Sequence, residues 1–349
     1  MASRRALGAE TALTGVGYIG ATMPGIGTFL SAGRSLEAAI ERVRLAESLN
    51  YDSTYVTHIA GRDSLTVLAA YAARTERIRL GTGVLPIYSR TPVATAQTAA
   101  TIDEVSAGRM VLGLGVSHRV TVEGWYGQRI GKPVSEMREY AGAVRAMLRG
   151  EDPSGGERWP TSFRFMGYEA RPELPIYIAA LSPNMLQLAG EIGDGVLLWL
   201  CDPPYVRDVV IPEVRKGRER AGKTMDGFDI VPAVPAAVTS DRAATLDRMR
   251  ADLVTYLSLP FYRSMLERSG FEGEIAGFDA GLAAGDVERA KAAMSEAMLD
   301  SLGGFGSAED VRGAVRRYLD AGAISPGVSP IPGAELEATL EAGAGMIGT

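Results

Sequence analysis

The two histidines of this 349-residue chain, His58 and His118, are its first candidates for proton chemistry. Each follows an apolar, β-rich run, residues 53–57 for His58 and residues 110–117 for His118. Both runs have the pattern of strands, so both imidazoles are expected at strand C-termini. Catalytic groups gather at that edge of parallel α/β proteins, because the loops there vary above a rigid scaffold. The placement favours proton exchange at neutral pH over the alternative that each histidine only caps a strand or packs in a loop.

Other kinds of chemistry find less support. Two histidines with no HxH or HExxH spacing do not supply the ligands of a barrel metallohydrolase, so we expect no metal. There is no GxSxG turn and no Cys-His pairing for nucleophilic hydrolysis. The single cysteine, Cys201, follows the apolar run 197–200 and is predicted to be a small buried hydrophobe rather than a nucleophile.

Composition limits the location and the partners. A hydrophobic share of 46% and a charged share of 22% are typical of a soluble globular protein, and no stretch of 18 uninterrupted apolar residues could cross a membrane. The N-terminus lacks the apolar region of a secretory signal, and one cysteine cannot form an internal disulfide, so we expect a cytoplasmic protein. The net charge of −6 and the absence of a Lys/Arg block argue against nucleic acid as a partner.

Strand-like and helix-like segments alternate along the chain. The expected strands are 14–19, 51–57, 78–84, 109–115, 175–180, 195–200, 229–238 and 323–330. The expected helices open at Ser35, Ser64, Thr91, Val134, Pro183, Val206 and Ser307. Thr91 is predicted as an N-cap, Gly108 as the C′ residue of the same helix, and residues 151–156 as a surface loop.

This alternation predicts a (β/α)8 TIM barrel, one domain over residues 1–349 with a helical insertion at about 241–300, between strands 7 and 8. No Pro/Gly-rich linker divides the chain into two doubly wound domains. Residues 15–20 match GxGxxG, but the match falls within a predicted strand rather than opening a helix, so it is weak evidence for a Rossmann fold.

Two strand ends have the features of ligand contacts. The third strand ends in a glycine-rich segment, residues 81–86, which predicts a bulge or a close approach of backbone to a ligand, with a simple turn as the alternative. After the fifth strand, Ser182 and Pro183 begin a helix as N-cap and N1. The amides of that helix start could bind an anion such as phosphate, although a plain helix cap needs no ligand.

Taken in order, several segments resemble one superfamily, the luciferase-like flavin and deazaflavin oxidoreductases, which includes bacterial luciferase and the F420-dependent reductases and dehydrogenases. The resemblance covers most of the chain. The segments are Tyr51–His58, Thr75–Val84, Ile102–Arg109 leading into Gly113–Gly115, Glu123–Gly127, and Ile176–Ala180 leading to Ala189–Gly195.

The resemblance implies a tricyclic cofactor in the barrel mouth, with its phosphate near the fifth strand. It also implies a non-prolyl cis peptide at Gly83-Val84 behind the ring, and it makes His58 the proton donor or acceptor beside the reactive edge as hydride moves to or from the substrate. The cofactor-binding residues implied are Thr57, Gly83, Val84, Gly115, Val116, Ala180, Leu181 and Ser182.

The choice of cofactor rests on the regions from His58 to Val84 and from Gly113 to His118, which are most similar to the F420-dependent relatives. The resemblance therefore implies an F420-dependent oxidoreductase. An FMN-dependent monooxygenase and a non-catalytic flavin-binding barrel stay open as alternatives. Relatives often have an acidic residue where Thr57 stands, and sugar-phosphate dehydrogenases have a glutamate near Val116, so sugar phosphate is a doubtful substrate.

Substrate recognition is expected from His118, Arg119 and Trp199, with the insertion contributing Tyr256, Phe261 and Tyr262. These insertion aromatics could equally form the core of the insertion or a dimer contact. We expect a small-molecule substrate, a homodimer, and no nucleic-acid or membrane partner.

Overall fold

A closed parallel barrel forms the centre of the molecule. The computed structural model describes residues 25–153 and 156–348. In these residues the barrel strands are β1 (Gly27–Phe29), β2 (Ser53–Val56), β3 (Arg79–Thr82), β5 (Met110–Gly115), β6 (Ile176–Ala179), β7 (Gly195–Leu198), β8 (Asp229–Val238) and β10 (Gly327–Pro330). They pair in this order, and β10 pairs with both β8 and β1, which closes the barrel. The predicted TIM barrel is confirmed.

The first barrel strand is a short segment that sequence reasoning missed. β1 pairs in parallel with β2 and β10, and it covers only Gly27–Phe29. The strand predicted at 14–19, together with the GxGxxG match at 15–20, lies outside the described residues. A three-residue strand that begins with glycine carries too little apolar pattern to be recognised from sequence.

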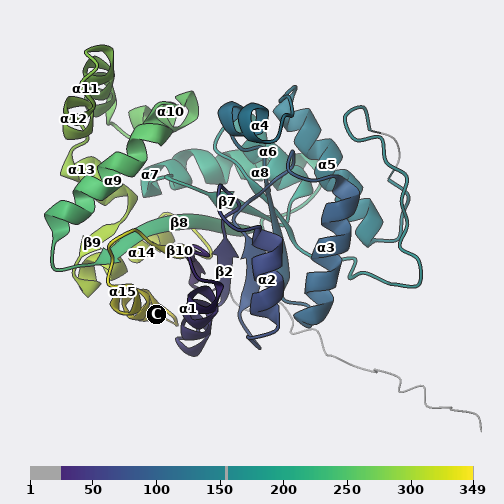
Figure 1. Cartoon of the computed structure of the whole chain (residues 1–349). Helices are drawn as coiled ribbons and strands as arrows, with labels where there is room; N and C mark the ends of the chain where they lie inside the picture. Colours follow the sequence, from purple (N-terminus) through teal and green to yellow (C-terminus); the bar gives the residue numbers. More distant parts are fainter. Residues whose placement is uncertain (1–24, 154–155, 349) are drawn as a thin grey trace, which may run out of the picture.

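Helices cover the outside of the barrel (Figure 1). They are α1 (Leu36–Ser48), α2 (Ser64–Ala72), α3 (Pro92–Val105), α4 (Arg119–Trp125), α5 (Pro133–Leu148), α6 (Pro183–Ile192), α7 (Pro203–Tyr205), the π-helix η1 (Val206–Val210), α8 (Ile211–Arg220), α14 (Ala308–Asp320) and α15 (Leu336–Ala344). The side chains of Ser35, Thr91 and Ser307 accept the N-cap hydrogen bonds of α1, α3 and α14. None of the helices in the described residues is both long enough and apolar enough to cross a bilayer.

One predicted helix end needs correction. Helix α3 ends at Val105 with Ser106 as C-cap, so the C′ position is held by Ala107 and not by Gly108. Ala107 has φ 55° and Gly108 has φ 85°. Two consecutive left-handed residues therefore reverse the chain before β5, and glycine accommodates the second of them without a Cβ clash.

Helices also fill the connection between the seventh and eighth barrel strands, β8 and β10. They are α9 (Arg242–Leu257), α10 (Pro260–Arg268), α11 (Glu272–Ala283), α12 (Val287–Ala292) and α13 (Glu296–Leu302), followed by a short strand, β9 (Gly304–Gly306). Figure 1 shows α9 to α12 grouped at the upper left, on the side of the barrel away from α3 and α5. β9 pairs with the end of β8, which anchors the return of the chain to the barrel.

The interior of the barrel is a packed core of its own, here called the inner cluster. Its buried members are Tyr55, Val111, Tyr177, Leu197 and Val231, with Phe29, Val84 and Ala179 partly buried against them. The rings of Phe29 and Tyr55 stack with centroids 4.9 Å apart. Glycines on neighbouring strands make room for these rings, since a Cβ on Gly81 would lie 2.4 Å from the Tyr55 ring. A filled interior confines any ligand to the open end of the barrel.

Candidate active site

The third strand carries the bulge that the glycine pattern predicted. Gly81 pairs with Val111, and pairing resumes in β4 (Leu85–Pro86), where Leu85 pairs with Leu114. Four steps along this strand thus match three steps along β5, so one extra residue is inserted. The hydroxyl of Thr82 occupies the gap: it accepts from Gly113 N at 2.9 Å and donates to Gly113 O at 2.7 Å.

The bulge places Gly83 and Val84 at the mouth of the barrel. The peptide bond between them is cis, as the family resemblance implied. Val84 is partly buried against the inner cluster. It lies next to Gly115 and Ala179, because a Cβ added to Gly115 would be 2.5 Å from Val84 Cγ2 and 3.5 Å from Ala179 Cβ. Val84, Gly115 and Ala179 therefore form a small apolar surface at the C-terminal ends of β3, β5 and β6. We call it the mouth floor.

His58 follows β2 at the same end of the barrel, and its side chain is 12% exposed. Its Nδ1 lies 3.1 Å from the hydroxyl of Ser64 and accepts from Ser64 N at 3.3 Å. Nδ1 is also 3.8 Å from the Asp63 carboxylate, which in turn accepts a hydrogen bond from Arg90. Among the described residues Nε2 has no hydrogen-bond partner, so this nitrogen is left for a ligand.

The environment of His58 favours a neutral ring. Burial lowers the pKa of His58, Asp63 opposes that change, Arg90 adds to it, and the pKa stays below its ordinary value. Ser64 suits both forms of Nδ1: its hydroxyl accepts a hydrogen bond from Nδ1–H, and its backbone N–H donates to Nδ1 when that nitrogen carries no hydrogen. The arrangement is that of a positioned acid–base group with one nitrogen free.

His118 follows β5, two strands along the barrel from β2, and begins a row of aromatic rings. It is the N-cap residue of α4, and burial lowers its pKa. Its ring lies 6.0 Å from that of Tyr262, Tyr262 lies 5.1 Å from Tyr256, and Tyr256 lies 6.0 Å from Trp199. This aromatic row joins the ends of β5 and β7 through the insertion. Phe261 is not part of it, since that side chain is 60% exposed.

Arg119 lies at the rim of the barrel mouth. It is the first residue of α4, its side chain is 65% exposed, and it pairs with Glu123 one turn later on the same helix. In this structure its guanidinium is engaged by a neighbour of its own helix, so its expected contact with substrate stays a prediction.

The start of α6 offers unpaired amides. Ser182 is the N-cap and Pro183 occupies the first turn, as predicted, although the Ser182 side chain makes no capping hydrogen bond. Ala180 N–H donates to Leu197 O and is therefore committed to the sheet. Leu181 and Ser182 have no acceptor for their N–H groups within the described residues. With the positive end of the helix dipole behind them, these two amides could bind an anion.

The remaining predicted residues lie close to these elements. Thr57 is the exposed residue between β2 and His58, and Val116 is half-buried directly after β5. Cys201 is fully buried, and burial raises the pKa of its thiol well above the ordinary value, which agrees with a structural role. The predicted site residues thus lie at or just after the C-terminal ends of parallel strands, at one end of the barrel.

Comparison with known proteins identifies the family. The family profile described as luciferase-like monooxygenase matches residues 19–324. The chain belongs to this family. It is 34% identical over 235 residues to a putative coenzyme F420-dependent oxidoreductase of Mycobacterium tuberculosis, covering 62% of this chain and 67% of the relative. It is 36% identical over 234 residues to a 5,10-methylenetetrahydromethanopterin reductase of Archaeoglobus fulgidus, covering 65% of this chain and 68% of the relative.

Two solved structures of F420-dependent enzymes have the same fold. The F420-dependent tetrahydromethanopterin reductase of Methanopyrus kandleri superposes with a TM-score of 0.79 at 22% identity, covering 93% of this chain and 98% of that one. An F420-dependent secondary alcohol dehydrogenase superposes with a TM-score of 0.75 at 18% identity, over 92% of this chain and 98% of that one. Together with the sequence match, these likenesses confirm the predicted luciferase-like enzyme fold.

One segment of the family resemblance is structural and lies away from the mouth. In residues 102–109, the Asp103 carboxylate accepts from Arg171 at 2.7 and 2.8 Å and from Met110 N at 3.2 Å. Arg109 donates to Thr75 Oγ1 and Ile78 O, both at 2.9 Å. These bonds fasten the start of β5 to its neighbours, so this part of the luciferase-like pattern holds the barrel together rather than contacting a ligand.

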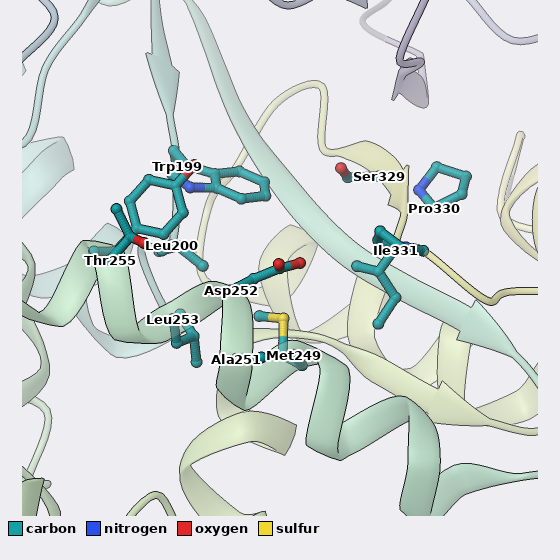
Figure 2. Close-up of a pocket in the computed structure, with 12 residues that line it drawn as sticks. Trp199, Leu200, Met249, Ala251, Asp252, Leu253, Thr255, Ser329, Pro330 and Ile331 are labelled. Carbon is teal, nitrogen blue, oxygen red and sulfur yellow. The ribbon is translucent and has the colours of Figure 1, made fainter. Parts of the chain in front are cut away.

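Sequence reasoning missed a cavity beside the aromatic row. It has a volume of about 410 Å³ and is lined by residues after β7, by α9 and by the end of β10, among them Trp199, Asp252, Tyr256 and Ser329 (Figure 2). It also missed the partners of His58, namely Asp63 and Ser64. Asp63 is a helix N-cap five residues after His58, and that spacing could have pointed to it.

Proposed function

We propose that this protein is an F420-dependent oxidoreductase that transfers a hydride between the deazaflavin and a small organic substrate. The observation that carries the proposal is His58, held at Nδ1 and free at Nε2, at the same end of the barrel as the glycine bulge. The putative coenzyme F420-dependent oxidoreductase at 34% identity supports the choice of cofactor.

The residues at the mouth fit a flat, anionic cofactor. The mouth floor presents a glycine backbone beside Val84 and Ala179, and no side chain projects from Gly83 or Gly115. The unpaired amides of Leu181 and Ser182 would hold the phosphate, while Thr57 and Val116 would line the edge of the ring. When bound, the deazaflavin supplies two-electron hydride chemistry without oxygen activation.

His58 moves the proton that accompanies the hydride. When hydride is added to a substrate carbon, the neighbouring oxygen or nitrogen gains a proton, and the Nε2–H of a protonated His58 donates it. The ring then returns to the neutral form that burial favours. In the opposite direction, neutral His58 accepts the proton at Nε2 while Nδ1–H donates to the Ser64 hydroxyl.

Cofactor titration tests the proposal. The purified protein is titrated separately with reduced F420 and reduced FMN, with fluorescence reporting binding and an electrode reporting oxygen uptake. We expect saturable binding of F420 without oxygen consumption. Oxygen uptake with FMN above the autoxidation rate of free reduced FMN would instead favour a monooxygenase. Failure to bind either cofactor would overturn the proposal and leave a non-catalytic barrel that binds another partner.

Replacement of His58 tests the proton role. His58→Ala should lower kcat by about 10²- to 10⁴-fold, because a positioned proton donor is lost, while the dissociation constant for F420 changes little. Steady-state kinetics and the same fluorescence titration measure the two quantities. Unchanged turnover would remove His58 from the mechanism.

A further inference from the structure

An exposed acidic residue flanks the buried face of α9. Met249, Leu253 and Tyr256 recur at steps of three and four, and they line the cavity described above. Asp252 lies three residues after Met249 and four before Tyr256, so it sits at the edge of this row, exposed to solvent, and also lines the cavity.

Asp252 also lacks a partner. Within residues 25–153 and 156–348 its carboxylate makes no hydrogen bond and no ion pair, whereas Asp247 on the same helix pairs with Lys291 at 3.1 Å. Partial burial raises the pKa of Asp252, and no neighbouring cation offsets the rise. Because the residue is exposed, water solvates this carboxylate in the free protein, and an ammonium group that enters the cavity can replace that water.

The walls of the cavity suit an organic cation. Figure 2 shows the Asp252 carboxylate directed into the space between Trp199, Ser329 and Ile331. The rings of Trp199 and Tyr256 form an edge-to-face pair on one side, and aromatic faces attract ammonium groups. The volume of about 410 Å³ lies in the range of pockets for small organic ligands.

We propose that this cavity is the substrate pocket and that it selects organic amines, whose ammonium group pairs with Asp252 while the carbon skeleton lies against Trp199 and Tyr256. The assignment of the pocket to substrate rests on the proposed function, because Trp199 belongs to the aromatic row that leads to His118 at the barrel mouth. The selectivity for a cation rests on the cavity alone.

Calorimetric titration with a charge series tests the selectivity. The probes are 2-phenylethylammonium, 2-phenylethanol and phenylacetate, which are similar in size and differ in charge. We expect the cation to bind about two- to five-fold more tightly than the alcohol, as one additional charge pair at an exposed carboxylate provides. Phenylacetate should bind most weakly. Equal affinity for the cation and the alcohol would overturn the proposal.

Variants locate the effect at Asp252. Asp252→Asn should abolish the preference for the cation with little change for the alcohol, and Asp252→Lys should reverse it in favour of phenylacetate. Asp247→Asn is the matched control, since it removes the same charge from the same helix outside the cavity lining. A preference that persists in Asp252→Asn, or disappears in Asp247→Asn, would refute the assignment.

A separate measurement tests whether the cavity binds the substrate of the proposed F420-dependent reaction. Because calorimetry needs no cofactor, failure to bind F420 would overturn the proposed function and leave the amine selectivity standing. In the loaded enzyme, Asp252→Asn should raise KM for an amine substrate about two- to five-fold with kcat nearly constant, whereas His58→Ala acts on kcat. A fall in kcat without a change in KM would exclude Asp252 from substrate binding.

Discussion

The two ends of the barrel use polar groups in opposite ways. At the N-terminal ends of the strands, the Arg79 guanidinium contacts the carboxylates of Asp52 and Asp229 and lies 3.4 Å from the Tyr177 hydroxyl. At the C-terminal ends, His58 Nε2 and the Leu181 and Ser182 amides have no partner in the described part of the chain. Charges that neutralise one another inside the protein stabilise the fold, whereas unpaired groups at an open mouth are available to a ligand.

Among the variants that test this difference between the two ends, Arg79→Met is expected to have the largest effect on stability. Asp229 is only 7% exposed, and burial already raises its pKa, so removing the neighbouring cation leaves a buried carboxylate without its counter-charge. We expect the free energy of unfolding to fall by about 3–5 kcal/mol in urea titration. F420 affinity in the folded fraction should be unchanged.

Arg79→Lys is the matched control, since it keeps the charge and should recover part of the loss. If Arg79→Met lowered the free energy of unfolding by less than about 1 kcal/mol, the N-terminal cluster would not be a stabilising element.

Substitutions at two glycines of β5 are expected to have the next largest effects. One should mainly destabilise the fold, and the other should mainly weaken cofactor binding. A Cβ on Gly113 would lie 2.0 Å from the backbone oxygen of Thr82, which cannot move without breaking the bulge, whereas a Cβ on Gly115 would meet the end of the Val84 side chain. Gly113→Ala should therefore lower the free energy of unfolding by about 1–3 kcal/mol or more. Gly115→Ala should lower it less and weaken F420 binding, because it disturbs the mouth floor.

Thermal unfolding and fluorescence titration measure both quantities on both variants. The distinction would fail if Gly113→Ala weakened cofactor binding without destabilising the protein, or if Gly115→Ala left F420 affinity intact.

The smallest expected effect is the contribution of His118 to the pH dependence of the free energy of unfolding. Burial lowers the pKa of His118 in the folded protein, so below the ordinary histidine pKa of about 6.5 the unfolded chain binds a proton that the folded protein does not. His118 therefore destabilises the fold progressively as the pH falls from about 6.5 through its lowered pKa. The His118→Gln variant should lose less unfolding free energy than the wild type over this range, by up to about 1.4 kcal/mol per unit of pKa shift.

Urea titrations at pH 7.5 and pH 5.0 measure this difference, and comparison with the wild type cancels the contribution of the carboxylates. Equal losses in the two proteins would show that His118 is solvated rather than buried.

The sequence by itself determined the barrel and the end at which its chemistry lies. Alternating strand and helix patterns recur along the chain, and caps such as Thr91-Pro92 mark the helix starts locally. Because parallel strands all point the same way, residues placed after them, such as His58 and His118, must meet at one end.

Only the tertiary structure decided which groups have partners. The Ser64 contact to His58, the use of the Ala180 amide by Leu197, and the isolation of Asp252 in a cavity depend on how distant segments pack. The short β1 strand at Gly27–Phe29 likewise became visible only through its pairing with β2 and β10. Local patterns record backbone preference and burial, but a hydrogen bond or an unpaired charge is a property of neighbours that the chain brings together only when it folds.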